Sequence, residues 1–276
     1  MTFRTYNQIE GEDRSRLLAQ VAKQRERVGR RLESVDRVVA VLSGKGGVGK
    51  SYVAAALARE LAQRPGNGVG VLDADLRSPT VAGLLGATGP LVVTDDGVEP
   101  AIGDHGVRVV STGLLLDEDQ PLRWKEPAEA RFVWRGTLES GTLREFLSDV
   151  VWGSLGLLLV DLPPGADGGV DLLELVPNLE GALVVTIPSE ESRRSVARTM
   201  RSASEAGVTL LGIVENMSGH RCDDCGVETP LFDGSAGSDL SADFGVPLLA
   251  RVPFSSGSGD PATWAGLVER FLGVLA

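Results

Sequence analysis

The chain has 276 residues, of which 42% are hydrophobic and 24% are charged. This length fits one large domain or two small ones, and this composition excludes a wholly disordered protein. The net charge of −11 and the isoelectric point near 4.8 argue against a general binder of nucleic acid or of an anionic membrane, because both ligands need a basic face. We therefore expect neither a nucleic-acid partner nor a membrane partner.

Residues 1–35 are predicted to form a charged helix or arm ahead of the main domain. The first residues lack the apolar stretch of a secretion signal, and no apolar run in the chain reaches the ~18 residues that a membrane span needs. These features predict a cytoplasmic protein. The apolar residues of the arm lie on a loose helical stripe: Leu17, Leu18, Val21, Val28 and Leu32.

Residues 36–276 are predicted to form one α/β domain. Short runs rich in Val, Leu and Ile alternate with helical patterns, and the runs lack polar alternation, which is typical of strands buried on both faces of a parallel sheet. This order predicts a doubly wound fold, with a mostly parallel sheet covered by helices on both faces. The predicted strands are Val38–Leu42, Val69–Leu72, Val107–Val110, Leu155–Val160, Ala182–Thr186, Thr209–Val214 and Pro247–Val252. The predicted helices include Ser51–Leu61, Glu190–Ala206 and Trp264–Leu275.

A glycine-rich turn joins the first predicted strand to the first predicted helix. It consists of Gly44, Lys45, Gly46, Gly47, Val48, Gly49, Lys50 and Ser51. Glycines allow backbone N–H groups to point at phosphate oxygens, and the helix N-terminus that follows adds partial positive charge. Lys50 is expected to neutralise the β- and γ-phosphates of ATP, and the Ser51 hydroxyl to coordinate Mg²⁺. The turn therefore predicts a P-loop ATPase in which this whole segment binds the nucleotide.

Three aspartates follow apolar strands and are candidates for the rest of an ATPase site. Asp161 ends the run Leu157–Val160 and has the form of a Walker B acid, which holds the Mg²⁺ shell. Asp75 is our candidate for orienting the attacking water, whereas Asp73 is expected to support the metal shell or the local hydrogen-bond network. Each has an alternative role, because aspartates at strand ends also cap helices and stabilise turns.

Several further motifs occur together in one order along the chain. They are Val133-Trp134-Arg135-Gly136, Val160-Asp161-Leu162-Pro163-Pro164-Gly165, Gly212-Ile213-Val214-Glu215-Asn216-Met217-Ser218 and Cys222-Asp223-Asp224-Cys225-Gly226. From about Val38 to the C-terminus, the sequence resembles the Mrp/ApbC family of P-loop ATPases. That family is similar to proteins that hold a [4Fe–4S] cluster and pass it to apo-enzymes.

The two lysines of the glycine-rich turn also resemble the deviant Walker A motif of the MinD, ParA, nitrogenase iron protein and Mrp group. This resemblance implies that Lys45 reaches across a homodimer and stabilises transition-state charge on the partner's nucleotide, as an arginine finger does. It also implies that Asn216 contacts the adenine. Tyr52 and Ala166 depart from the family pattern, in which threonines stand at the corresponding positions.

The chain has two cysteines, Cys222 and Cys225, in a predicted metal-binding loop at about 216–230. Thiolates are soft ligands that suit iron–sulfur clusters or Zn²⁺. A [4Fe–4S] cluster usually takes four cysteines, and two chains that meet at this loop supply four. Three alternatives remain open: a structural Zn²⁺ shared across the dimer, a redox dithiol, and two thiols without a ligand.

Motifs and resemblance together predict a homodimer that binds ATP, Mg²⁺ and a [4Fe–4S] cluster and delivers the cluster to apo iron–sulfur proteins. Hydrolysis of ATP to ADP and phosphate is expected to be slow and coupled to binding or transfer of the cluster, with Lys45, Lys50 and Asp75 as catalytic residues.

Two alternatives are a MinD/ParA-type positioning switch and a zinc-bridged targeting ATPase. A basic C-terminal tail would favour the first, but the final predicted helix has only Arg270 as a basic residue. A methionine-rich groove would favour the second, but the chain has three methionines.

Overall fold

The computed structural model describes residues 17–66, 68–115, 141–165, 173, 176–222, 225–254 and 260–276. Its helices are α1 (Leu17–Arg31), α2 (Lys50–Ala62), α3 (Val81–Leu84), α6 (Glu190–Glu205), α7 (Ala236–Phe244) and α8 (Pro261–Leu275), with a further helical stretch at 141–149. Its strands are β1 (Val38–Ser43), β2 (Val69–Asp73), β3 (Val92–Thr94), β4 (Gly97–Glu99), β5 (Ala101–Ile102), β6 (Arg108–Val110), β7 (Leu157–Asp161), β8 (Leu179–Thr186), β9 (Leu210–Arg221), β10 (Glu228–Thr229) and β11 (Leu248–Phe254). The motif at 133–136 and the predicted departure at Ala166 lie outside the described residues.

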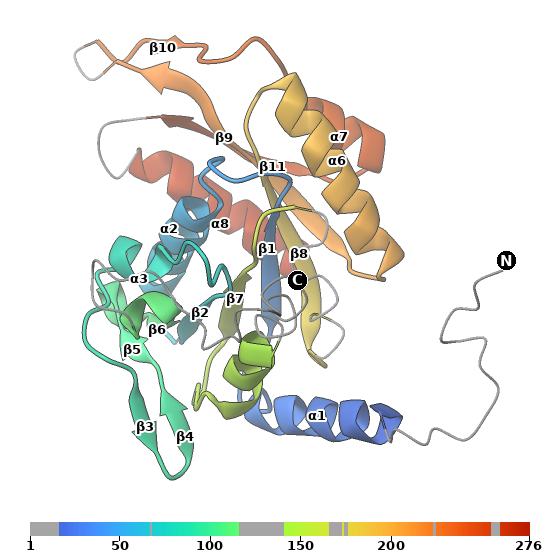
Figure 1. Ribbon diagram of the computed structural model, residues 1–276. Coiled ribbons are helices and arrows are strands. Elements are labelled where there is room, and N and C mark those ends of the chain that lie inside the picture. The colour runs from blue at the N-terminus through green and yellow to red at the C-terminus, as the bar shows by residue number, and fades with distance from the viewer. Residues whose placement is uncertain are drawn as a thin grey trace, which may run out of the picture.

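Nine of the described strands form one sheet with β1 near its centre (Figure 1). The strand order is β10-β9-β8-β1-β7-β2-β6-β5, and β11 pairs with β9. The pairings of β1, β2, β7, β8, β9 and β11 with one another are parallel, and β2 also pairs in parallel with β6, whereas β5 and β10 pair antiparallel with their neighbours. All seven predicted strands are present, and the predicted α/β fold with a mostly parallel sheet is confirmed.

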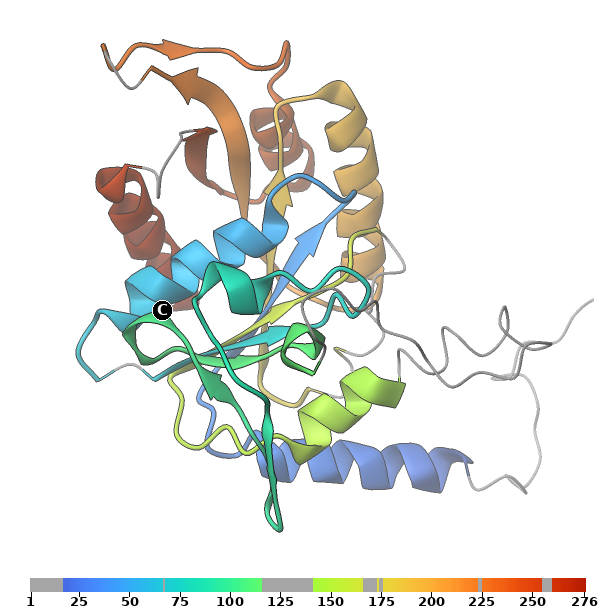
Figure 2. The same cartoon turned by 60° about the vertical axis from the view of Figure 1, so that its left-hand side comes forward.

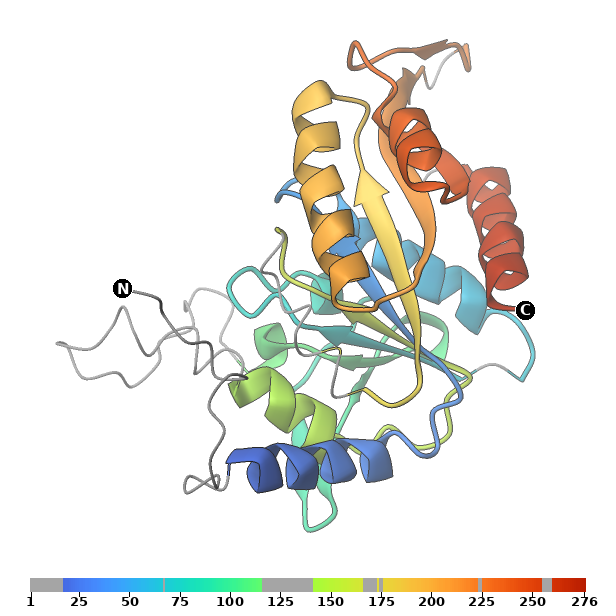
Figure 3. The ribbon, with the colours of Figure 1, turned by 90° about the vertical axis from the view of Figure 1, so that its right-hand side faces the viewer.

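Helices cover both faces of the sheet, as Figures 1 and 2 show. In β1, Val39 and Val41 belong to one buried cluster, which includes residues of α2 and α8. Val38 and Ala40 point to the opposite face and belong to a second cluster, which includes residues of α1 and the helical stretch at 141–149. A third cluster packs α6 and α7 against β8 and β9, and Figure 3 shows α6 lying along β8. This two-sided burial explains why the strands read as continuous apolar runs.

The predicted N-terminal helix is present as α1, and its last turn packs on the domain. Val28 and Leu32 are fully buried in the second cluster, and Val35 joins them after the helix ends. Arg27 forms an ion pair with Asp149 at 2.7 Å. These contacts pack Val28, Leu32 and Val35 against the domain, and the boundary at residue 36 stays a prediction.

Two parts of the fold differ from the sequence prediction. β3 and β4 form a separate hairpin whose Val92 and Val93 side chains are exposed, so neither strand shows the buried pattern that identified the others. β9 continues to Arg221, although its apolar run ends at Val214 and we expected a loop from residue 216. The polar second half of β9 remains a strand because β10 and β11 pair with it.

Candidate functional site

The glycine-rich turn lies between β1 and α2, at the carboxyl edge of the sheet. Because β1, β2 and β7 are parallel neighbours, their ends bring this P-loop, Asp73 and Asp161 to one edge. Gly49 has a φ of 80°, and a Cβ at this position would overlap the side-chain amide of Asn216. Both the backbone conformation and the available space therefore require glycine there.

The start of the P-loop is held against α6. The Ser195 hydroxyl donates a hydrogen bond to the carbonyl oxygen of Gly44 at 2.5 Å. A Cβ at Gly44 would overlap the backbone of Ser195 and Val196, so glycine is needed for this close approach. The P-loop thus contacts α6 at Gly44, its first residue.

Lys50, Ser51 and Asp161 form a compact polar cluster beneath the loop. The Lys50 Nζ lies 2.6 Å from Oδ1 of Asp161, and the Ser51 hydroxyl donates to Oδ2 of the same carboxylate at 2.6 Å. The Lys50 and Asp161 side chains are 6% and 0% exposed. Burial raises the pKa of Asp161, while Lys50 and the Ser51 hydrogen bond act in the opposite direction. The structure therefore brings together the three residues that the sequence assigns to phosphate and Mg²⁺ binding.

This cluster has the donor chemistry of a magnesium–nucleotide site. A hydroxyl and a carboxylate stand side by side in Ser51 and Asp161, and such hard oxygen donors suit Mg²⁺. The ammonium of Lys50 is already positioned in the loop by its ion pair with Asp161. A phosphate can replace Asp161 as the partner of Lys50, which leaves the carboxylate to the metal shell.

Asp73 is buried and serves the local hydrogen-bond network. Its Oδ2 accepts hydrogen bonds from the N–H groups of Thr80 and Val81 and from the Ser111 hydroxyl, at 3.0–3.1 Å. These bonds tie the start of α3 and the residue after β6 to the end of β2. Burial, reinforced by the nearby charge of Asp161, raises the pKa of Asp73 to about 7.

Asp75 is half-buried in the turn that follows β2. Its Oδ1 accepts a hydrogen bond from the N–H of Ser78 at 3.3 Å, which stabilises the turn. Its charge also contributes to the raised pKa of Asp161, so it lies close enough to act on the polar cluster. Its role in orienting water stays a prediction.

The two lysines of the P-loop have different surroundings. Lys50 points inward to Asp161, whereas Lys45 is partly exposed. Across the described ranges, the Lys45 ammonium has no hydrogen bond or ion pair. This arrangement leaves the charge of Lys45 available to a group outside its own chain.

Asn216 joins β9 to the P-loop. Its side-chain amide donates a hydrogen bond to the carbonyl oxygen of Val48 at 2.9 Å, and the side chain is almost completely buried. The predicted contact of Asn216 with adenine stays a prediction. The next residue, Met217, has a φ of 52°, which is uncommon for a residue other than glycine and unusual inside a strand. The register of β9 against β11 shifts at the same place, so β9 has an irregular point beside the P-loop.

The cysteine pair lies at the far end of β9. The chain turns there from β9 into β10, and we call the segment from Asn216 to Thr229 the cysteine hairpin (Figure 1). The N–H of Cys222 donates to the carbonyl of Val227, and the N–H of Gly226 donates to the carbonyl of Cys222, both at 2.9 Å. Cys222 is partly exposed and Cys225 is exposed, and the two form no disulfide. Among the described residues, no group of three or more His, Cys, Asp or Glu side chains is arranged to hold a metal ion.

Exposed apolar side chains accompany the cysteine hairpin, and sequence reasoning did not identify them. Val227 is 57% exposed and follows the turn, while Phe254 is 50% exposed and ends β11 beside His220 of β9. Leu231 and Phe232, just after β10, are also exposed. An apolar residue in a sequence does not reveal its exposure, so only the fold shows this grouping.

Tyr52, the predicted departure beside the P-loop, belongs to the packing between α2 and α8. Its ring meets that of Trp264 edge-on, with centroids 5.7 Å apart and an interplanar angle of 69°. Burial raises the pKa of the Tyr52 hydroxyl.

In the part of the chain that the structure describes, no helix has the length and apolar character to cross a bilayer.

Solved structures of other proteins share this fold. A nucleotide-binding protein from Archaeoglobus fulgidus in complex with ADP aligns with a TM-score of 0.69 and 34% identity, covering 89% of this chain and 92% of that one. The cell-division ATPase MinD of Pyrococcus furiosus aligns with a TM-score of 0.57 at 22% identity, covering 88% of this chain and 100% of that one. The MinD likeness supports the P-loop ATPase fold alone.

Comparison with the sequences of other proteins identifies the family to which this chain belongs. An iron–sulfur cluster carrier protein of Saccharolobus solfataricus is 37% identical over 229 residues, which cover 82% of this chain and 74% of that protein. The human cytosolic Fe–S cluster assembly factor NUBP2 is 39% identical over 244 residues, which cover 86% of this chain and 84% of that protein. The family model of the NUBPL iron-transfer P-loop NTPase, within the ParA group, matches residues 34–261. The chain therefore belongs to the NUBPL family of iron-transfer P-loop NTPases.

Proposed function

We propose that this chain is an ATP-hydrolysing carrier that holds a [4Fe–4S] cluster between two copies of itself and delivers it to apo iron–sulfur proteins. The observation that carries this proposal is the path of β9. That strand contacts the P-loop through Asn216 and leads, within the same hairpin, to Cys222. One element therefore joins a nucleotide site to a pair of soft metal ligands.

In the nucleotide half of the proposal, the P-loop amides and Lys50 bind the phosphates of ATP. Ser51 and Asp161 hold Mg²⁺, which when bound neutralises charge on the β- and γ-phosphates. Asp75 orients the attacking water. Lys45 crosses to the partner's nucleotide, which fits the absence of any partner for its ammonium within the described residues.

Hydrolysis in this scheme is slow in a single chain and depends on dimer formation. The positive charge that stabilises the transition state comes from the partner subunit, so an isolated chain lacks one catalytic group. Each nucleotide site is completed only when two copies meet. The same meeting brings the two cysteine pairs together.

In the cluster half of the proposal, each chain contributes Cys222 and Cys225. Four thiolates complete a [4Fe–4S] cluster, whereas one chain supplies two. The apolar side chains of Val227 and Phe254 accompany the pair, and burying them between two copies gains free energy while excluding water from the cluster. The exposure of the pair in one chain suits a cargo that must leave again.

ATP changes cluster retention only if two dimer arrangements differ in their affinity for nucleotide. In this proposal, β9 couples the nucleotide site to the cysteines, because a shift of the P-loop at Val48 displaces Asn216. The irregular point at Met217 lies between Asn216 and the cysteines and is where the strand can bend.

The names of the cytosolic relatives support a cytoplasmic location for this activity.

The experiment that tests this function is anaerobic reconstitution with iron and sulfide, followed by a visible spectrum and a metal count. The wild-type chain is compared with Cys222→Ala/Cys225→Ala. We expect a broad band at about 400 nm with about two iron and two sulfide per chain, and we expect the variant to lose the band, the iron and the sulfide. A colourless protein with about half a zinc per chain would refute the cluster and support a zinc-bridged ATPase instead.

A further inference from the structure

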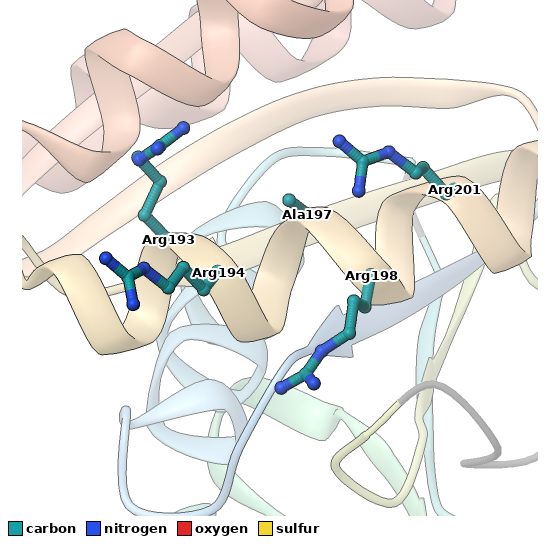
Figure 4. A pocket seen from close by; sticks show the side chains of 5 residues that line it. All are labelled: Arg193, Arg194, Ala197, Arg198 and Arg201. Atoms are coloured by element: carbon teal, nitrogen blue, oxygen red, sulfur yellow. The ribbon is translucent and has the colours of Figure 1, made fainter.

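A concentrated basic surface lies on α6, in a chain whose net charge is −11. Four arginines on this helix line a hollow of ≈ 310 Å³ around Ala197 (Figure 4). We call this surface the arginine face, and its members are Arg193, Arg194, Arg198 and Arg201. Neither the nucleotide site nor the cysteine hairpin uses these side chains.

Contacts with α7 hold one side of the arginine face. Arg193 forms ion pairs with Glu190 and with Asp243 of α7, each at 3.0 Å. The guanidinium of Arg201 lies 5.8 Å from the ring centroid of Phe244, also in α7. These contacts orient two of the four guanidinium groups before any partner arrives.

The other two arginines are directed to solvent. Arg194 is 74% exposed, although Glu190 lies 2.9 Å from its Nε. Arg198 is exposed, and in the described portion of the chain its guanidinium has no hydrogen bond or ion pair. In Figure 4, Arg198 points away from the side of the helix on which Arg193 and Arg201 lie. The fold therefore leaves positive charge unmatched at Arg198.

The spacing of the arginines suits an extended acidic chain. Arg194 and Arg198 are four residues apart and Arg201 follows three residues later, so their backbone positions are about 6 Å and about 4.5 Å apart along the helix axis. Carboxylates on alternate residues of an extended peptide are about 7 Å apart, which arginine side chains can span. A guanidinium also binds a carboxylate through two parallel hydrogen bonds. The Ala197 methyl and the arginine stems form an apolar floor between these charges.

This geometry distinguishes between classes of anion. A single small anion is best held by donors that converge on one point, whereas these arginines are distributed along the helix (Figure 4). A nucleic acid carries a dense line of phosphates, which the acidic remainder of the chain repels. A short acidic peptide segment meets the arginine face with less repulsion.

We propose that the arginine face of α6 is a docking surface for an acidic, extended segment of a protein partner. This inference is independent of what the cysteines bind. α6 contacts the P-loop through Ser195 and Gly44, so a docked segment lies on the same helix that supports the nucleotide site. The partner is defined by its carboxylates, with about four extended residues covering the ~12 Å from Arg193 to Arg201.

The test measures binding of a fluorescently labelled oligoglutamate peptide to the full chain by anisotropy, at low ionic strength. The variant is Arg194→Gln/Arg198→Gln. It removes two positive charges, and because glutamine is neutral, the new side chains are not repelled by Glu190. The matched control is Arg25→Gln/Arg30→Gln, which removes the same charge from exposed positions of α1. Thermal unfolding of all three proteins verifies that each is folded. A labelled single-stranded oligonucleotide is titrated in parallel.

We expect saturable binding of oligoglutamate that weakens with added salt, because the contacts are between charges. The α6 variant should bind about tenfold more weakly, which corresponds to ~1.4 kcal/mol, while the α1 variant should bind as the wild type does. No binding by the wild type, or equal losses in the two variants, would overturn the proposal. Tighter binding of the oligonucleotide than of the peptide would overturn the assignment to an acidic protein segment.

Discussion

The side-chain amide of Asn216 donates a hydrogen bond to the carbonyl oxygen of Val48 at 2.9 Å, and so ties the strand that leads to the cysteines to the phosphate-binding loop. The two residues are 168 positions apart in the sequence. Their contact connects the two halves of the proposed function directly. It also explains the glycine at position 49, where a Cβ would overlap this amide.

Replacing Asn216 with Ala should weaken nucleotide binding and uncouple it from the cysteines. Loss of one buried hydrogen bond costs about 1–1.5 kcal/mol, so we expect roughly a tenfold weaker affinity for ATP by calorimetry. Cluster loss to an iron chelator should then no longer respond to ATP. Ser218→Ala, a substitution in the same strand beyond Met217, serves as the control. An unchanged ATP response in Asn216→Ala would show that β9 does not carry the coupling.

The two P-loop lysines should respond differently to the same substitution. Lys50→Met leaves the buried Asp161 without its ion-pair partner, so we expect the free energy of unfolding to fall by about 3 kcal/mol and ATP binding to be lost. Lys45→Met should change stability by no more than about 0.5 kcal/mol and should keep ATP binding. It should lower the hydrolysis rate about 10³-fold, as removal of an arginine finger does.

Denaturant titration, calorimetry and phosphate release at saturating ATP together separate these outcomes. The account of Lys50 fails if both lysine variants lose similar stability. The account of Lys45 fails if its variant hydrolyses ATP at the wild-type rate.

Met217 should be a position where glycine is more stabilising than alanine. At an ordinary strand position Gly is the worse of the two, but the φ of 52° at Met217 penalises any residue with a Cβ. Both Met217→Gly and Met217→Ala lose the same packing, so their difference isolates the backbone. We expect the Gly variant to be about 1 kcal/mol more stable in urea unfolding. A more stable Ala variant would mean that Met217 does not adopt this conformation in solution.

Asp73 should make the nucleotide-free protein less stable as the pH rises. Its pKa is about 7 in the folded chain against 3.8 for an unperturbed carboxyl, so between these values the folded state binds a proton that the unfolded state releases. The free energy of unfolding therefore decreases as the pH rises from about 4 to about 7, and between about pH 5 and pH 7.5 this group alone lowers it by roughly 2–3 kcal/mol.

Urea titrations near pH 5 and near pH 7.5 check this dependence. Asp73→Asn should lose less stability over the interval than the wild type does, while Asp95→Asn, at the exposed tip of the β3–β4 hairpin, should behave as the wild type. Identical pH dependence in Asp73→Asn and the wild type would rule out the assigned pKa shift.

Much of the fold was predictable because it depends on local patterns. The buried strand ending at Asp161 reads as an apolar run, and the P-loop is recognisable because glycines, Lys50 and Ser51 occur together between a strand and a helix. The pairing of Lys50 with Asp161 follows once β1 and β7 are neighbours.

Other parts depend on contacts between distant residues and have no local signature. The second half of β9 is polar, and it is a strand only because β10 and β11 pair with it. The bond from Asn216 to Val48 requires the whole sheet to be assembled. The sequence left two roles open for Asp73, the metal shell and the local hydrogen-bond network, and only the fold shows that its carboxylate accepts hydrogen bonds from Thr80 and Val81 at the start of α3.

The measurement that tests the central claim most directly is native mass spectrometry of the anaerobically reconstituted chain. We predict a dimer that carries one four-iron, four-sulfide cluster, with the cluster absent when Cys222 and Cys225 are both replaced by Ala. A dimer held by one zinc ion, or a cluster bound to a single chain, would contradict the account.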